Sequence, residues 1–208
     1  MIKFVVFICG AIVMSFEILG SRVLAPNFGS SVFVWGSLIS IFLAGLSTGY
    51  YLGGWLADRN PSSRKLSLII IAPGILFLIF PLYSAPVSDW LFVKDLGVRL
   101  SPLLASLMLF LIPSVFLGIV SPYTAKLLIC SLRTSGKTIG TLYALSTFGS
   151  IIGTLITSFY LITIAGTNVL IMGQGIILIV IAIPLYFMNL RCQISDTHGH
   201  ARGTLLMD

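Results

Sequence analysis

The chain has 208 residues, of which 57% are hydrophobic and only 9% are charged. Soluble globular domains carry roughly 25% charged residues, so a water-soluble fold could not solvate such a surface. Apolar runs of about 20 residues, each long enough to cross a hydrocarbon core of roughly 30 Å, recur along most of the length. The composition therefore predicts an all-α, polytopic transmembrane helical bundle. It excludes a membrane β-barrel, whose strands would alternate polar and apolar residues.

The net charge of +6 invites a nucleic-acid-binding interpretation. We reject it because the basic residues stand singly between apolar runs. The three cysteines, Cys9, Cys130 and Cys192, lack the spacing of a disulfide framework or a metal site. His198 and His200, on a polar tail, are too few for a metal centre. We expect the lipid bilayer as a partner, with no nucleic acid, no metal and no cofactor.

Six membrane spans are predicted, with boundaries in chain order at residues 3–24, 31–56, 66–83, 103–128, 139–164 and 168–190. Residues 1–190 would form one transmembrane domain with two halves, at about 1–84 and 103–190. The stretch 84–102 between the halves is the one long connection. We expect it to lie as an amphipathic helix in the membrane interface. Residues 191–208 are polar and aperiodic, which predicts a disordered cytoplasmic tail.

Lysine and arginine collect on one side of the predicted spans. Nine lie at the N-terminus, around the loops after the second and fourth spans, or after the sixth span, whereas the opposite loops hold only Lys94 and Arg99. Cytoplasmic loops retain an excess of positive charge. The bias predicts a multi-pass protein of the cell (inner, cytoplasmic) membrane with both termini in the cytoplasm.

A pattern of glycines in the second span recurs in the fifth. Gly45 and Gly49 are matched by Gly149 and Gly153, each shifted by 104 residues, which is half of the chain. The shift pairs the second helix of one three-helix set with the second helix of another set that has the opposite topology. Transporters are often built from such repeats. The pattern predicts a 3+3 inverted repeat.

Small residues at four-residue spacing form a flat strip on one face of these two spans. They are Gly45, Gly49 and Gly53 in the second span and Gly149 and Gly153 in the fifth. Such strips let helix backbones approach closely inside a membrane, where van der Waals contact holds helices together. We expect packing to be their main role and ligand contact to be secondary.

Glu17 lies near the middle of the first span. A charged residue at that depth costs roughly 2.5–3.5 kcal/mol on insertion scales, and such residues usually face a bundle interior or a wet cavity. This predicts a site for a proton or a cation. Arg22 follows five residues later, roughly 140° around the helix, so the two side chains do not stack as a simple pair. Snorkelling to the interface and a role in the site both remain open for Arg22.

Polar side chains on the second and fifth spans are candidates to line the same site. They are Tyr50, Tyr51, Tyr143, Thr147 and Ser150. Each could instead form hydrogen bonds between helices. Asp58 and Arg59 are placed in the cytoplasmic loop after the second span. No phosphate-binding loop, dinucleotide fingerprint or hydrolase elbow occurs, so no catalytic residue is predicted.

Four blocks of sequence resemble the membrane domain of the fused spermidine-synthase-like (polyamine aminopropyltransferase-like) integral membrane proteins. They are FEILGSRVLAPNFG at 16–29, GLSTG at 45–49, GGWLADR at 53–59 and GTLYALSTFGSIIGT at 140–154. The membrane part of that family is described as similar to a six-helix half of a major facilitator superfamily transporter. The loop at Asp58-Arg59 departs from the facilitator pattern, because Asn60-Pro61 stands where glycine is expected.

The resemblance implies a transporter-like module that handles a polyamine or another small organic cation. Members of the family continue into a soluble aminopropyltransferase-like domain, and no such domain follows the sixth span here, so we do not expect this chain alone to be an enzyme. Six helices would be half of a facilitator, which implies a homodimer or a partner chain. The alternative is a membrane anchor or regulator of a separately encoded aminopropyltransferase-like or methyltransferase-like enzyme.

Overall fold

The computed structural model describes residues 1–59, 61–131 and 135–188. Its elements, in chain order, are α1 (Ile2–Phe28), α2 (Val32–Ala57), α3 (Ser63–Lys94), α4 (Gly97–Ser131), α5 (Ser135–Ile156), the π-helix η1 (Thr157–Leu161), α6 (Ile162–Ile164) and α7 (Thr167–Phe187). The last part of the predicted domain and the predicted tail, residues 189–208, lie outside the described residues. Within the described ranges, six helices, with α5, η1 and α6 counted as one, are long and apolar enough to span a membrane. The predicted all-α bundle of six spans is confirmed.

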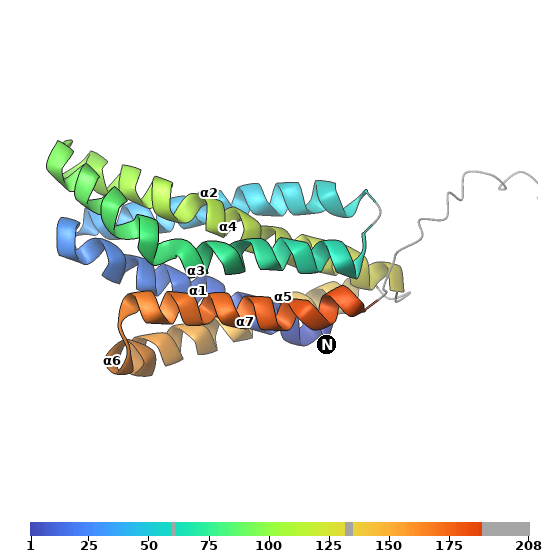
Figure 1. Cartoon of the computed structure of the whole chain (residues 1–208). Coiled ribbons are helices and arrows are strands. Elements are labelled where there is room, and N and C mark those ends of the chain that lie inside the picture. Colours follow the sequence, from blue (N-terminus) through green and yellow to red (C-terminus); the bar gives the residue numbers. More distant parts are fainter. Residues whose placement is uncertain (60, 132–134, 189–208) are drawn as a thin grey trace, which may run out of the picture.

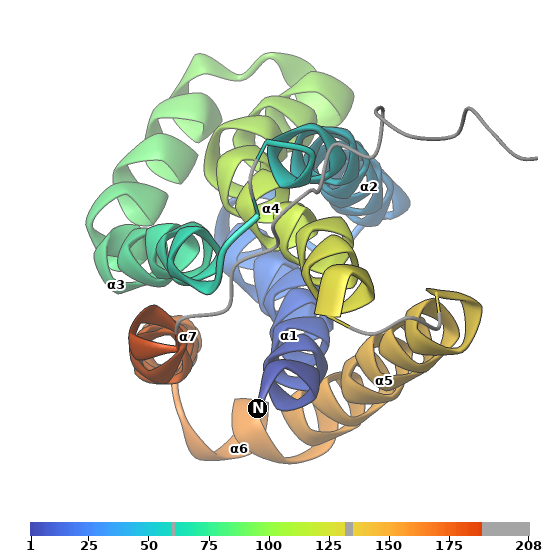
Figure 2. The ribbon, with the colours of Figure 1, turned by 90° about the vertical axis from the view of Figure 1, so that its right-hand side faces the viewer.

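The six spans run side by side along a common axis (Figure 1). An end-on view places α1 and α4 in the middle, with α2, α3, α7 and α5 around them (Figure 2). The bundle is held at its centre by a cluster of buried phenylalanines. The Phe16 ring centroid lies 4.3 Å from that of Phe77, 5.3 Å from that of Phe110 and 5.5 Å from that of Phe42. Since these rings come from α1, α2, α3 and α4, they join four of the six spans.

The connection predicted at 84–102 is helical, as expected, but it extends the two neighbouring spans, so the predicted span ends at 83 and 103 were wrong. Helix α3 continues to Lys94, and α4 begins at Gly97. Ser84, Ser88 and Leu91 are buried at helical spacing against the bundle. This packing holds the stretch against the bundle as part of the spans, in place of the separate interfacial helix that was expected. The two halves of the chain are therefore joined by two residues rather than by a long interfacial segment.

The tight α3–α4 connection uses two residues with positive φ, Asp95 at 40° and Gly97 at 89°. We expect Gly97→Ala to lower the free energy of unfolding by about 1–2 kcal/mol, because a Cβ is strained in left-handed backbone. Asp95→Gly is the matched control, since it removes a Cβ from the same kind of conformation. Thermal unfolding in detergent, followed by tryptophan fluorescence, measures both. Equal losses of stability in the two variants would contradict this account of the turn.

The small-residue strips of α2 and α5 each lie against a central helix. A Cβ placed on Gly49 would overlap the carbonyl oxygen of Val115 in α4, and a Cβ on Gly45 would lie 3.1 Å from that of Leu111. A Cβ on Gly53 would lie 2.7 Å from the carbonyl oxygen of Ile119. Helix α2 therefore packs on α4 with backbone directly against backbone.

Helix α5 packs on α1 in the same way. A Cβ on Gly149 or Gly153 would overlap the carbonyl oxygen of Phe7 or Ala11, respectively. The partner residues Phe7 and Ala11 are themselves 104 residues before Leu111 and Val115. One shift thus relates the glycines and also their contacts.

The third helix pair, α3 and α7, is reciprocal as well. Gly74 lies against Gly175 and Leu178, while Gly175 lies against Gly74 and Phe77. Gly175 and Leu178 of α7 stand 101 residues after Gly74 and Phe77 of α3. The two helices therefore contribute corresponding residues to the contact. Among the described residues, the glycine contacts of the α2–α4 and α1–α5 pairs thus correspond through one shift, and those of the α3–α7 pair correspond to each other through another.

Candidate functional site

A cavity of about 190 Å³ lies on the side of the bundle where α2 and α5 stand apart. Figure 2 shows α1 and α4 between these two helices. Its lining comes from all four helices, and the hydroxyl-bearing residues of the lining come from α2, α4 and α5: Tyr50, Ser121, Tyr143, Ser146, Thr147 and Ser150. Two phenols and four aliphatic hydroxyls therefore line one small space.

Four of the residues predicted from the sequence line this cavity: Tyr50, Tyr143, Thr147 and Ser150. Tyr51 does not, and 78% of its surface is exposed. Adjacent helical residues point about 100° apart, so Tyr50 and Tyr51 cannot both face one cavity. The Ser150 hydroxyl also lies 3.0 Å from the Gly10 carbonyl oxygen and 3.1 Å from that of Ser146, so it helps to join α5 to α1.

Glu17 is half-buried on α1 and, within the described residues, forms no hydrogen bond or ion pair. It follows Val13 and Met14, both of which line the cavity, by four and three residues. Residues at these spacings share one helix face. The carboxyl group is therefore on the cavity face of α1, one turn further along the helix and outside the immediate lining.

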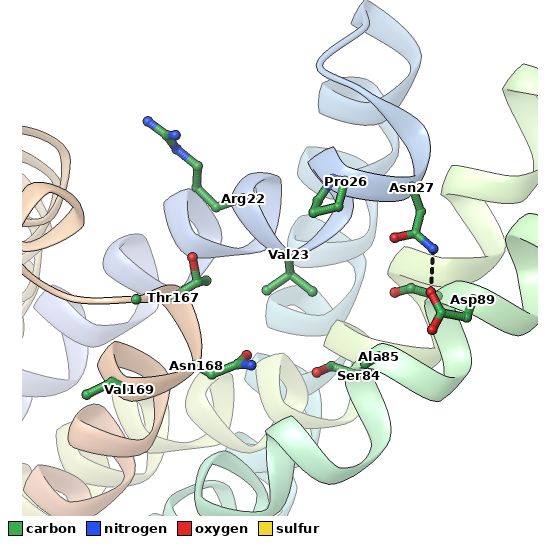
Figure 3. Close-up of a pocket in the computed structure, with 12 residues that line it drawn as sticks. Arg22, Val23, Pro26, Asn27, Ser84, Ala85, Asp89, Thr167, Asn168 and Val169 are labelled. Atoms are coloured by element: carbon green, nitrogen blue, oxygen red, sulfur yellow. Dashed lines mark hydrogen bonds between the residues drawn. The ribbon is translucent and has the colours of Figure 1, made fainter.

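Arg22 is separated from Glu17 and lines a second cavity, of about 430 Å³, at the other end of the bundle. This cavity lies between the last turns of α1, the second half of α3 and the start of α7 (Figure 3). On its α3 side the Asn27 side-chain amide donates a hydrogen bond of 2.8 Å to the Asp89 carboxylate. This cavity could not be predicted from the sequence, because residues 84–102 were expected to form a connecting segment.

Asp58 and Arg59 follow the C-terminal end of α2, and both side chains contact neighbouring residues. Asp58 forms an ion pair of 2.8 Å with Lys126 of α4, and the two side chains are 68% and 40% exposed, respectively. The Arg59 guanidinium stacks 3.8 Å from the centre of the Trp55 ring. Exposed ion pairs contribute at most about 1 kcal/mol, so this pair orients the helix ends more than it stabilises them.

A buried polar triad joins three helices near the middle of the bundle. The Ser15 and Thr157 hydroxyls are 2.5 Å apart, and the Gln174 side-chain amide donates to the Ser15 oxygen at 2.6 Å. Thr157 begins η1, where the fifth span widens to a π-turn. A lone glutamine in an apolar span was the available signal for the triad. Nothing in the sequence signalled the π-turn.

No cluster of metal-ligating side chains is present in the part of the chain that the structure describes. No protein-family model matches this chain, and no match is found among curated proteins or among solved structures.

Proposed function

We propose that this chain is a transporter-like membrane module that binds a small organic cation, with polyamines as the first candidates, on the side of the bundle between α2 and α5. The observation that carries the proposal is Glu17, an unpaired carboxyl group on the cavity face of an apolar span. Intramembrane ionisable residues are expensive to insert and usually mark substrate or ion pathways. The faces of Tyr50 and Tyr143 add favourable surfaces for an ammonium group.

The helix contacts support an inverted repeat as the framework of this module. Under such a repeat α2 and α5 exchange, as do α1 with α4 and α3 with α7. The paired contacts Gly49–Val115 and Gly153–Ala11 follow this rule with a single shift of 104 residues. Under that repeat the cavity would lie between helices that exchange with each other, and inverted-repeat transporters bind their substrates at the interface of the repeats. A second copy of the chain, or a partner chain, would cover the open side and complete the path.

The test is binding of spermidine and putrescine to the purified chain in nanodiscs, with the wild type beside Glu17→Gln. We expect the substitution to weaken binding at least tenfold, because it removes the carboxylate that neutralises the ligand and keeps the side-chain volume. Asp58→Asn is the control, since it also removes one carboxylate, but at a helix end. Equal affinity in the wild type and Glu17→Gln would reject the proposed cation site.

Absence of binding in the wild type would direct attention to the alternative role as an anchor of a soluble synthase-like or methyltransferase-like enzyme. Affinity purification from the native membrane would then test for such an enzyme at the basic cytoplasmic loops.

A further inference from the structure

The start of α7 presents unpaired backbone donors to the 430 Å³ cavity. Its first helical hydrogen bond runs from the Leu170 amide to the Gly166 carbonyl oxygen, so the amides of Thr167, Asn168 and Val169 precede the hydrogen-bonded ladder. No side chain caps this helix, and its first turn holds no acidic residue. Together with the helix dipole, these donors favour a negatively charged group.

Two buried hydroxyls of α3 form an independent sign that the cavity is built for a ligand. Ser88 lines it with 3% of its surface exposed, and its oxygen has no hydrogen-bond partner among the described residues. Ser84 is 4% exposed, and Figure 3 shows its hydroxyl facing Asn168 across the cavity. An unpaired buried hydroxyl costs about 1–3 kcal/mol. A polar ligand in the cavity would supply the missing partner.

The two charged side chains of the lining lie at opposite ends of the cavity (Figure 3). Arg22 stands at the rim of the cavity, and Figure 3 shows its exposed guanidinium turned outward, with no ion pair in the described part of the chain. Asp89 lies at the other end and is oriented by Asn27. The α7 amides therefore make one end of the cavity positive, with the Arg22 cation available at its rim, and Asp89 makes the other end negative.

We propose that this cavity binds a small zwitterion in which an oxyanion, phosphate or carboxylate, is linked to an ammonium group. The oxyanion lies against Arg22 and the start of α7, and the ammonium group lies against Asp89. The cavity volume, about 430 Å³, is within the roughly 300–1,000 Å³ typical of small-molecule sites. The ligand is either free in solution or the headgroup of a lipid. This site shares no residue with the cavity between α2 and α5, so it is independent of the proposed cation site.

The first experiment is calorimetry of the full chain in an uncharged detergent, with phosphoethanolamine and inorganic phosphate as probes. Arg22→Gln is expected to weaken binding of both probes about tenfold. Asp89→Asn is expected to weaken phosphoethanolamine about tenfold and to leave inorganic phosphate equal or stronger, because only phosphoethanolamine carries the ammonium group. Arg99→Gln is the control, since Arg99 is a cation at the same end of the bundle but lies outside the lining.

The lipid arm measures phosphatidylethanolamine retained by the delipidated protein, using native mass spectrometry with the same variants. Binding of the soluble probe identifies a free zwitterion, and retention of the lipid alone identifies a headgroup. Ser88→Ala separates a ligand site from a structural pocket, because it should weaken binding several-fold while the ligand-free protein melts at the same or a higher temperature. Binding that is absent in both arms, or unaffected by Arg22→Gln and Asp89→Asn, would overturn the proposal.

Discussion

Gly49→Ala and Gly153→Ala are each expected to destabilise the folded bundle by about 3 kcal/mol, although each adds only one methyl group. The added Cβ would overlap a backbone carbonyl oxygen, of Val115 for Gly49 and of Ala11 for Gly153. Backbone atoms inside a helix cannot move aside as a flexible side chain can. The helices must separate instead, and the packing along the whole strip is weakened.

Two other glycines on the same helices provide matched controls. Gly36 in α2 and Gly140 in α5 have no heavy atom within 4 Å of a built Cβ. Alanine there should be neutral or stabilising by about 0.5–1 kcal/mol, since glycine is unfavourable inside a helix. Thermal unfolding in detergent, combined with size-exclusion profiles, measures all four variants. The packing account fails if the buried and open positions respond alike.

Ser15→Ala is expected to destabilise the protein by about 2 kcal/mol, and more than Gln174→Leu does. Removing the Ser15 hydroxyl leaves the Gln174 amide and the Thr157 hydroxyl without their partner, and each unpaired buried group costs about 1–3 kcal/mol. Gln174→Leu removes the amide together with its oxygen, which already lacks a partner in the described structure. The Ser15–Thr157 contact survives that change.

A double-mutant cycle measures the coupling between Ser15 and Gln174 directly. Adding Gln174→Leu to Ser15→Ala should recover part of the lost stability, because the stranded amide is then gone. The free energy of unfolding of the four proteins, measured by titration with a denaturing detergent, gives the coupling between the two sites. Strictly additive losses would show that the triad does not act as a unit.

The six helical spans could be predicted from hydropathy alone, because each apolar run is long enough to cross a bilayer and a backbone in lipid must be helical. Their ends could not. Ser84, Ser88 and Leu91 continue the third span because they pack on the bundle, and local sequence does not encode that contact. The cavity beside Arg22 could not be predicted for the same reason, because part of its lining comes from this stretch of α3.

The candidate lining residues were chosen from the sequence because they are polar side chains on the two spans that carry the glycine strips. The structure brings four of them, Tyr50, Tyr143, Thr147 and Ser150, to one cavity, and that grouping was not available from the sequence. Spacing alone could not choose between Tyr50 and Tyr51, since that choice depends on which neighbour each face meets. Spacing did separate Glu17 from Arg22 around the helix, but it could not show that Arg22 lines a second cavity.

The π-turn at Thr157–Leu161 has a mechanical consequence. The residue 104 positions before Thr157 is Gly53, which lies in an ordinary α-helical turn of α2. A helix that accommodates one additional residue in a turn rotates everything beyond it by about 100°. The far end of the fifth span therefore presents to the lipid a different face from the one that α2 presents. If α2 and α5 tilt against the central helices α1 and α4, the two helices start from different geometries. Tilting in one direction would therefore differ in energy from tilting in the other.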